Sequence, residues 1–251
     1  MGERAGMAGD SGTEEGIGAR REPDLTLIVP AYNEENRIDL LLRGMPGVRA
    51  RYIIVCDGTD RTPALVKEFA ASHPDIDLQC LEYPRRLGKG GAIAEGMRHA
   101  TTAYVGFMDA DGSASAGTMG GLLATIDSAD GVIGSRWVPG AVLPVHQGLL
   151  RRFQSRAFNG MIRYLLGLPF RDTQCGAKLF RKSAIDEVLP EIVSHGFEFD
   201  AELLWRMKKH GFFVKESPIT WTNRVNSRVH GRDVIHMLAG LISLRVRSRG
   251  T

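Results

Sequence analysis

The stretch that decides the fold is residues 25–45, LTLIVPAYNEENRIDLLLRGM. It begins with an apolar run without polar alternation, which is typical of a strand buried on both faces of a parallel sheet. It continues with apolar residues at three- and four-residue spacing, as in an amphipathic helix. Strand patterns recur at 52–57, 76–83, 104–110 and 131–136, and helical patterns recur at 62–73, 89–100 and 114–128. This alternation predicts a three-layer α/β/α domain with a mostly parallel sheet.

The pattern changes after about Arg136. A long helix with several arginines is expected in residues 149–168, a strand at 177–180 and a helix at 199–211. Residues 212–221 predict two strands broken near Pro218. No linker or internal repeat divides the chain, so we expect one domain over residues 24–230, a disordered tail at 1–23, and an amphipathic helix with a basic tail at 231–251.

Composition excludes several classes of protein. The net charge of +3 is too small to indicate general nucleic-acid binding. The three cysteines are widely spaced and odd in number, which suits a reducing compartment rather than a disulfide framework or a zinc site. No apolar run approaches the roughly 20 residues that span a bilayer, and the N-terminus lacks a secretory signal. We therefore expect a cytoplasmic protein.

Unusual polar residues follow three of the predicted strands. Asn33 and Glu34 come after the first strand, Asp57 after the second, and Asp109 and Asp111 after the fourth. Ligands of open α/β sheets bind beyond the carboxyl ends of the strands. The sequence therefore predicts a binding site at this edge of the sheet.

Asp109 and Asp111 lie in the segment 104–113, YVGFMDADGS. An extended backbone would direct both carboxylates to the same side, where they would suit Mg²⁺ or Mn²⁺ with positions left for substrate phosphates. The alternative is a polar turn that ends a buried strand, because Asp and Gly favour turns. The pattern by itself leaves both interpretations open.

Three other features each have two interpretations. Residues 85–92, RRLGKGGA, place basic residues and glycines at a helix start, where backbone N–H groups and Lys89 would hold a diphosphate or simply face solvent. Asp57 is either an Asx-turn residue or a nucleoside ligand, whereas Asp60 is expected to cap the next helix. Tyr32 either stacks on a base or packs at the strand end.

Taken together, the motifs resemble the family 2 inverting glycosyltransferases. VPAYNEENRI, VCDGTDRT, RLGKGGAIAEG and FMDADGS occur in order, and GSRW, DTQCGAKLF, FEFDAELL and PITWTNRVNSRV narrow the match. The set is similar to the dolichyl- and polyprenyl-phosphate glucosyltransferases and mannosyltransferases, and it covers residues 25–229. This resemblance implies an A-type nucleotide-sugar glycosyltransferase fold, a donor of the UDP-glucose or GDP-mannose type, and Mg²⁺ or Mn²⁺ as cofactor.

The resemblance also implies roles for individual residues. The donor-binding positions are Pro30, Tyr32, Glu34, Asp57, Lys89, Ser113, Trp221, Ser227 and Arg228. The metal positions are Asp109 and Asp111, and the acceptor-phosphate positions are Arg136, Arg151 and Ser155, with Arg152 as the alternative to Arg151. Two positions depart from the usual pattern of the family, which has an acidic residue at Cys56 and commonly a glycine at Asn226.

The acceptor determines whether a base is needed. A polyprenyl phosphate already carries an anionic oxygen, whereas a hydroxyl acceptor would need a base, for which Asp200 is the first candidate and Asp172 the second. A third possibility is a nucleotide-sugar binding protein without turnover. The helix predicted in residues 233–249 either lies on an anionic membrane surface or packs on the core. We expect a peripheral enzyme at the cytoplasmic membrane face whose partners are the nucleotide sugar, the lipid phosphate and the membrane.

Overall fold

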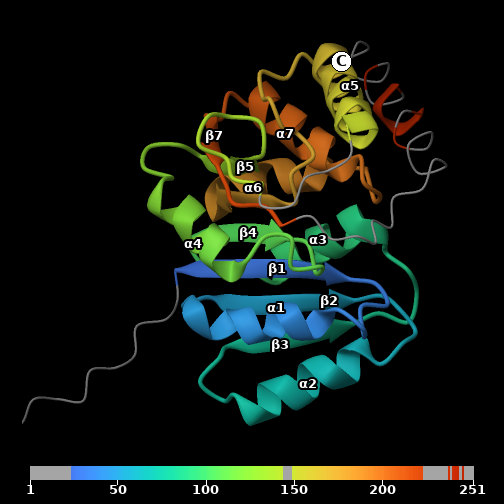
Figure 1. The fold of residues 1–251 in the computed structure, drawn as a ribbon, viewed down its shortest axis with the longest axis vertical. Helices are drawn as coiled ribbons and strands as arrows, with labels where there is room; N and C mark the ends of the chain where they lie inside the picture. The colour runs from blue at the N-terminus through green and yellow to red at the C-terminus, as the bar shows by residue number, and fades with distance from the viewer. Residues whose placement is uncertain (1–23, 144–148, 223–236, 238, 243–244, 246–251) are drawn as a thin grey trace, which may run out of the picture.

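The computed structural model describes residues 24–143, 149–222, 237, 239–242 and 245, with the backbone alone for residues 149–155. A seven-stranded sheet in the order β3-β2-β1-β4-β6-β5-β7 runs through the molecule (Figure 1). The strands are β1 (Leu25–Ala31), β2 (Arg51–Cys56), β3 (Leu78–Glu82), β4 (Tyr104–Met108), β5 (Gly131–Ser135), β6 (Ala177–Arg181) and β7 (Val214–Pro218).

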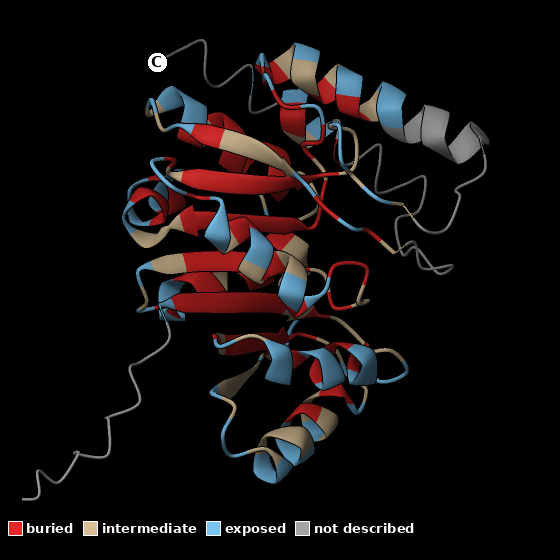
Figure 2. Ribbon diagram, turned by 60° about the vertical axis from the view of Figure 1, so that its left-hand side comes forward, coloured by how far each residue is buried: buried red, intermediate tan, exposed pale blue. Residues whose placement is uncertain are grey.

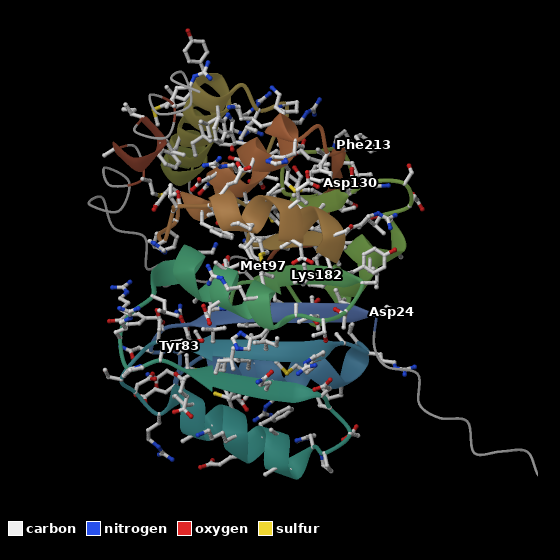
Figure 3. The ribbon with its side chains drawn as sticks, turned by 180° about the vertical axis from the view of Figure 1, so that it is seen from behind. Asp24, Tyr83, Met97, Asp130, Lys182 and Phe213 are labelled. Atoms are coloured by element: carbon white, nitrogen blue, oxygen red, sulfur yellow. The ribbon has the colours of Figure 1, made fainter. Side chains whose placement is uncertain are left out.

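Helices cover both faces of the sheet. They are α1 (Ile38–Gly44), α2 (Thr62–Ser72), α3 (Gly88–His99), α4 (Ala116–Ala124), α5 (Leu149–Leu166), α6 (Lys182–Val188) and α7 (Phe199–Lys209), with 3₁₀ turns η1 (Met45–Gly47) and η2 (Leu189–Glu191). Buried residues of α1, α2 and α4 form one core cluster, and those of α3, α5, α6 and α7 form the other. Helices α1 and α4 lie in front of the sheet in Figure 1, and α3, α6 and α7 lie in front in Figure 3.

The sequence of β1 explains this three-layer arrangement. Its residues alternate between the two clusters: Leu27 and Val29 pack with α1 and α4, whereas Ile28 packs with α3. Because both faces are covered, the strand is apolar apart from Thr26, which is buried as well. Figure 2 shows the central strands as buried and the outer faces of the helices as largely exposed, whereas the edge strands β3 and β7 are less buried. The predicted three-layer α/β/α fold is confirmed.

One strand runs against the others. β6 pairs antiparallel with both β4 and β5, whereas the other neighbouring pairs in the sheet are parallel. Met108 at the carboxyl end of β4 is therefore opposite Ala177 at the start of β6. The loop that enters β6 consequently lies at the edge of the sheet where β4 and β5 end. This edge is also where the sequence predicts the binding site.

The second half differs from the predictions in two places. Residues 212–221 contain a single strand, β7, rather than two, because β7 ends at Pro218 and Thr220 makes only an isolated bridge to Val142. The helix α6 was not predicted, since it follows β6 directly without a turn residue. The remaining strands and helices within the described residues fall where the periodicity places them.

The described residues near the C-terminus are helical and pack on the core. Met237 and Leu241 are buried, and Leu241 belongs to the cluster that includes α5 and α7. Gly240 lies against the side chain of Glu198, which precedes α7. This supports the core-packed alternative for part of the segment, while Ile242 on the same segment is exposed. The expected tail at residues 1–23 lies outside the described residues.

Within the part of the chain that the structure describes, no helix has the length and apolar character to cross a membrane.

Candidate active site

Asp57 stands at the carboxyl end of β2 and organises the loop that leads into α3. Its Oδ2 accepts hydrogen bonds from the backbone N–H groups of Leu87, at 2.8 Å, and Gly88, at 3.1 Å. The side chain is buried, so these two N–H donors supply its hydrogen bonds in place of water. Asp57 therefore joins the end of β2 to the entry of α3.

The loop after β1 is held by its own side-chain bonds. Asn33, in the left-handed region with φ 53°, accepts a hydrogen bond from the N–H of Thr59 at 2.8 Å through Oδ1. Glu34 is buried, forms an ion pair with Arg37, and donates its N–H to Thr62 Oγ1 at 2.8 Å. These bonds fasten the loop after β1 to the loop after β2.

Two donor-binding candidates lie beside this loop. Tyr32 is partly buried, and the guanidinium carbon of Arg86 lies 4.1 Å from the centre of its ring. Pro30 lies near the carboxyl end of β1, where its register partner is Val55. Asp60 Oδ1 accepts a hydrogen bond from the N–H of Thr62 at 3.0 Å, so Asp60 satisfies a donor of the first turn of α2 as expected.

At the start of α3, the N–H groups of Gly90 and Gly91 are bonded to backbone carbonyls of the protein. The N–H of Gly90 donates to the carbonyl of Gly196 at 3.2 Å, and that of Gly91 donates to the carbonyl of His195 at 3.1 Å. Together with the bonds to Asp57, these contacts use N–H groups that would otherwise attract an anion. Two cations of this segment lie at the site: Lys89 pairs with Asp109, and Arg86 lies over the ring of Tyr32.

Asp109 and Asp111 occupy a turn directly after β4. The Oδ1 of Asp111 accepts the N–H of Ser113 at 2.9 Å, which makes a local Asx-type turn. Ser113 is buried, and its carbonyl accepts the N–H of Thr222 at 3.0 Å. The turn interpretation of YVGFMDADGS is thus correct, and the turn places both carboxylates at the carboxyl edge of the sheet.

Gly176 in the loop before β6 makes room for the Asp109 carboxylate. A Cβ built on Gly176 would overlap Asp109 Oδ2. This close approach follows from the antiparallel pairing, which sets the end of β4 against the start of β6. Only glycine fits at this position without displacing the carboxylate.

Four charged side chains run inward from Asp109 in alternating sign. Lys89 Nζ lies 3.0 Å from Asp109 Oδ1 and 3.1 Å from Asp200 Oδ2, and the other oxygen of Asp200 pairs with Lys178. Asp200 is in the first turn of α7, and Lys178 is in β6. Lys178 is fully buried and also donates to the carbonyl of Cys175 at 2.6 Å.

These contacts determine the protonation states of Lys89 and Asp200. Burial alone would lower the pKa of Lys89, yet the carboxylates of Asp109 and Asp200 raise it above the usual value for lysine. Burial alone would raise the pKa of Asp200, but the ammonium groups of Lys178 and Lys89 hold it below its usual value. Asp200 is therefore a carboxylate between two cations, and such a group is a weak proton acceptor.

Arg136 and Asp172 form a second buried pair, at the end of β5. Arg136 Nε donates to Asp172 Oδ2 at 2.7 Å, and Nη2 donates to Oδ1 at 2.9 Å, which is a bidentate contact. Burial would lower the pKa of Arg136, but the Asp172 carboxylate raises it. Asp172 itself is fully buried and receives the backbone N–H of Arg136 as well.

Trp221 closes this side of the site. It is buried, and the Arg136 guanidinium carbon lies 5.2 Å from the centre of its ring. Its backbone N–H donates to the carbonyl of Val142 at 2.9 Å. Of the remaining predicted site residues, Ser227 and Arg228 lie outside the described residues, as do the side chains of Arg151, Arg152 and Ser155 on α5.

The residues present fit a divalent cation of the Mg²⁺ or Mn²⁺ kind. Asp109 and Asp111 supply carboxylate oxygens at one edge of the sheet, and the absence of a side chain at Gly176 leaves room for the Asp109 carboxylate. Among the described residues, no three His, Cys, Asp or Glu side chains form a cage around a metal ion. Two carboxylates with open positions suit a metal that also binds substrate phosphates.

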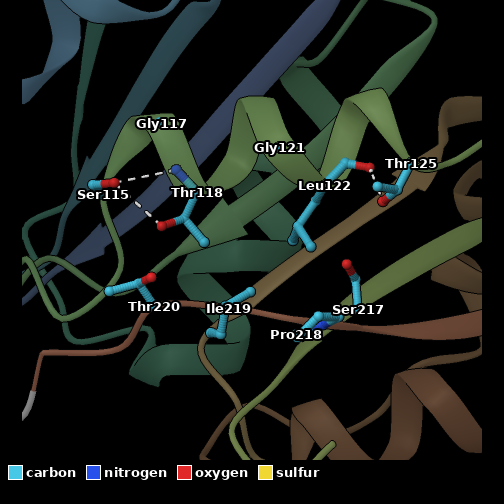
Figure 4. A pocket seen from close by; sticks show the side chains of 10 residues that line it. All are labelled: Ser115, Gly117, Thr118, Gly121, Leu122, Thr125, Ser217, Pro218, Ile219 and Thr220. Carbon is cyan, nitrogen blue, oxygen red and sulfur yellow. Dashed lines mark hydrogen bonds between the residues drawn. The ribbon is translucent and has the colours of Figure 1, made fainter. Parts of the chain in front are cut away.

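A hollow of about 440 Å³ lies elsewhere, between α4 and the end of β7 (Figure 4). It is lined by Ser115, Gly117, Thr118, Gly121, Leu122, Thr125, Ser217, Pro218, Ile219 and Thr220. None of these lining residues is charged, so the hollow does not have the chemistry of a diphosphate site. The charged groups at the ends of β2, β4 and β5 remain the candidate active site.

Sequence reasoning missed three contributors to this site. Lys178 was not singled out because a lysine in a predicted strand is usually exposed, whereas here it is fully buried. Gly176 was quoted only as part of a motif. Arg86 was read as part of a basic loop, and nothing in the pattern placed it over Tyr32.

Comparison with known proteins agrees with the site chemistry. A family model described as glycosyl transferase family 2 matches residues 26–189. Polyprenol monophosphomannose synthase of Mycolicibacterium smegmatis is 33% identical over 208 residues, covering 79% of this chain and 77% of that protein. A dolichyl-phosphate beta-glucosyltransferase of Trichomonas vaginalis is 30% identical over 242 residues, covering 89% and 71% respectively. Glycosyltransferase AglD of Haloferax volcanii is 28% identical, and the match covers 90% of this chain but 37% of that protein.

Solved structures show the same fold. The mannosyltransferase PcManGT from Pyrobaculum calidifontis, in complex with GDP-Man and Mn²⁺, superposes with a TM-score of 0.62 at 19% identity, covering 91% of this chain and 65% of that one. Glucosyl-3-phosphoglycerate synthase from Mycobacterium tuberculosis, in complex with Mn²⁺, UDP and glucosyl-3-phosphoglycerate, gives 0.63 at 17% identity, covering 90% and 79%. The expected A-type glycosyltransferase fold is confirmed.

Proposed function

Because the chain belongs to glycosyl transferase family 2, we propose that it transfers a hexose from a nucleotide sugar to a polyprenyl phosphate, with inversion at the sugar. The donor is of the UDP-glucose or GDP-mannose type. Relatives whose names specify dolichyl-phosphate or polyprenol acceptors support this choice. The presence of both Asp109 and Asp111 after β4 argues against the alternative of a nucleotide-sugar binding protein without turnover.

One observation carries the choice of a phosphate acceptor over a hydroxyl. Both carboxylates considered as a base are engaged by cations: Asp200 by Lys89 and Lys178, and Asp172 by Arg136. A hydroxyl acceptor needs a group that takes its proton, and an ion-paired carboxylate is poorly suited to that task. A lipid phosphate is already anionic near neutral pH and needs no base.

In the proposed reaction, an oxygen of the lipid phosphate forms a bond to the anomeric carbon as the bond to the donor diphosphate breaks. The electron pair of the broken bond stays on the leaving nucleoside diphosphate. Asp109 and Asp111 would hold the cation, which supplies charge stabilisation for that leaving group. Lys89, 3.0 Å from Asp109, would face the same developing charge.

The remaining assignments concern how the substrates are oriented. Tyr32, Glu34, Pro30 and Asp57 would bind the nucleoside, because hydrogen bonds join the loops after β1 and β2 at this place. Arg136 would orient the acceptor phosphate, with Arg151 and Ser155 contributed by α5. Trp221, together with Ser227 and Arg228, would cover the donor, with Ser113 beside the cation.

The acceptor proposal is tested with a matched pair of lipids. Each of several UDP- and GDP-sugars is incubated with Mg²⁺ or Mn²⁺ and either a short polyprenyl phosphate or the corresponding polyprenol, which differs only in carrying a hydroxyl. We expect sugar transfer to the phosphate, loss of transfer with a chelator, and no transfer to the alcohol. Transfer to the alcohol at a comparable rate would refute the phosphate acceptor.

We also propose that the protein lies peripherally on the cytoplasmic face of a membrane. Tyr164 on α5 is 90% exposed, and Ile242 is exposed on the C-terminal segment, whose Leu241 belongs to the same core cluster as Ile162 of α5. Tyrosine is well suited to the membrane interface, because its ring is apolar and its hydroxyl is polar. Changing Tyr164 and Ile242 to Ser should reduce co-sedimentation with anionic liposomes, whereas the control Phe213→Ser, at another exposed apolar site, should not. Equal binding of both variants would contradict this role.

A further inference from the structure

Lys178 is an unusual residue to find in the middle of a sheet. It lies in β6, with Phe107 of β4 and Ile133 of β5 as its register partners, and its side chain is fully buried. A lysine is almost never fully buried unless it is paired, because removing an ammonium group from water is costly. Its position is therefore maintained by the groups around it.

The contacts of Lys178 point toward the site. Its Nζ donates to the carbonyl of Cys175 at 2.6 Å and pairs with Asp200 Oδ1. Cys175 precedes Gly176, whose backbone lies against the Asp109 carboxylate. Lys178 thus fixes both α7, through Asp200, and the loop that borders Asp109.

Asp200 divides its two oxygens between two lysines. Oδ1 faces Lys178, and Oδ2 faces Lys89 at 3.1 Å. Lys89 in turn lies 3.0 Å from Asp109 Oδ1. The four charges sum to zero and extend from the centre of the sheet to the candidate metal site.

We propose that Asp200 and Lys178 are positioning residues that hold the Lys89 ammonium beside Asp109, where it faces the departing diphosphate. This rests on the proposed function and deepens it by giving Asp200 a role other than that of a base. Lys178 supplies the counter-charge that keeps the buried Asp200 ionised, and Asp200 then shares Lys89 with Asp109. Without Asp200, the ammonium would keep Asp109 as its carboxylate partner and compete with the divalent cation for it.

A salt bridge between Lys178 and Asp200 would otherwise only stabilise the fold. A purely stabilising role and the positioning of Lys89 can be distinguished by substitution. Replacing a buried ion pair by uncharged groups of similar size is often neutral for stability, whereas removing one partner is destabilising. The double variant Lys178→Met with Asp200→Asn removes both charges of the pair. The single variant Asp200→Asn leaves the Lys178 ammonium buried without its carboxylate.

The experiment measures binding without turnover. UDP and GDP are titrated by calorimetry into the full chain with Mn²⁺ present, and Mn²⁺ is titrated into the complex with whichever nucleotide binds. The matched control is Lys182→Met with Asp186→Asn, which removes an exposed ion pair at the start of α6, where Lys182 is labelled in Figure 3. Melting temperatures of all variants are recorded alongside.

We expect the double variant to melt near the wild-type temperature and yet to bind the nucleoside diphosphate with Mn²⁺ about tenfold more weakly. Asp200→Asn should show the same weakening and in addition a lower melting temperature. In both variants kcat should fall together with the nucleotide affinity. The Lys182 and Asp186 control should retain wild-type values of all three quantities.

Two outcomes would overturn the proposal. A folded double variant that binds nucleoside diphosphate and Mn²⁺ as the wild type does would make the pair purely structural. Asp200→Asn that loses kcat alone, with unchanged nucleotide and Mn²⁺ affinity, would assign Asp200 the role of a base. Failure of the wild type to glycosylate a polyprenyl phosphate would refute the proposed function instead, because the comparison of nucleotide binding does not depend on the acceptor.

Discussion

The two halves of the molecule fix their polar site residues by different means. In the half from β1 to β4, the carboxylate of Asp57 is held by the backbone N–H groups of Leu87 and Gly88. In the half that follows, Arg136 is held by Asp172, and Asp200 is held by Lys178, through buried ion pairs. Asp57 thus relies on backbone donors at a loop entry, whereas Arg136 and Asp200 rely on charge pairs between distant segments. The Lys89–Asp109 pair extends this second kind of contact into the first half.

This difference has an energetic consequence. A hydrogen bond to a backbone donor contributes about 1 kcal/mol net, or somewhat more when the acceptor is charged. Breaking a buried ion pair costs about 3–5 kcal/mol, because the remaining charge is left in a poorly hydrated place. Conservative substitutions of Asp57 should therefore lower the free energy of unfolding only slightly. Substitutions that break the ion pairs of Arg136 or Lys178 should lower it by several times as much.

The largest expected effect is on stability, from Asp172→Asn. The substitution keeps the shape of the side chain but leaves the Arg136 guanidinium, which is 13% exposed, without its bidentate carboxylate. We expect the free energy of unfolding to fall by about 3 kcal/mol in urea titrations. The control is Asp186→Asn, which breaks an exposed pair with Lys182 and should change stability by less than about 0.5 kcal/mol. Equal losses for the two variants would mean that burial of the pair is unimportant.

Gly176→Ala should have the next largest effect, on activity. The added methyl group would overlap the Asp109 carboxylate and displace it. A displacement of about 1 Å in a reacting group can reduce the rate about 100-fold, so we expect kcat to fall by that order and the Mn²⁺ requirement to rise. The control is Gly121→Ala in α4, where a Cβ meets nothing within 4 Å, and this variant should keep its activity. Full activity of Gly176→Ala would show that the loop before β6 can shift without displacing the Asp109 carboxylate.

Much of the first half was predictable from the sequence because its elements are locally encoded. Its strands and helices follow one another with regular apolar periods, and Asp57 and Asp109 stand where parallel strands end. The reversed direction of β6 leaves no such pattern, since an antiparallel strand buried on both faces has the same apolar composition as a parallel one. The position of the loop before β6 could therefore not be inferred.

The sequence predicted the location of the candidate site but not the contacts among its charged side chains. Asp109 and Asp200 were both selected, but the sequence does not show that Lys89 lies between them. Lys178 is 22 residues from Asp200, and only the packing of α7 on β6 brings the two together. Pairs of this kind depend on the tertiary fold, which local periodicity does not encode.

Asp57→Asn tests the carboxylate that is held by backbone N–H groups, and its expected effect on stability is smaller. The asparagine Oδ1 still accepts from the N–H groups of Leu87 and Gly88, so only the charge of the acceptor is lost. We expect the free energy of unfolding to fall by about 1 kcal/mol, measured under the same conditions as for Asp172→Asn. A loss as large as that of Asp172→Asn would remove the distinction between the two halves.

The smallest effect concerns Tyr52 in β2 and is confined to alkaline solution. Its single hydroxyl proton is shared between the carbonyls of Met45 and Val48, each 3.1 Å away, and burial raises its pKa from 10.0 to about 12. Because the folded state disfavours the phenolate, this contribution to stability is fully present below pH 10 and is lost as the pH rises from 10 toward 12. At pH 11 the loss should be about 1 kcal/mol relative to pH 9.

Tyr52→Phe isolates that contribution, because it lacks the ionisable group. The variant should be less stable than the wild type by about 1 kcal/mol at pH 8, where the two hydrogen bonds are missing, and this gap should narrow as the pH passes 10. Urea unfolding of both proteins at several pH values between 8 and 11 measures the difference directly. A gap that stays constant across this range would mean that Tyr52 ionises as easily in the folded state as in the unfolded chain. The hydrogen bonds to Met45 and Val48 would then account for the whole contribution of the hydroxyl, with no measurable cost from burying the phenolate.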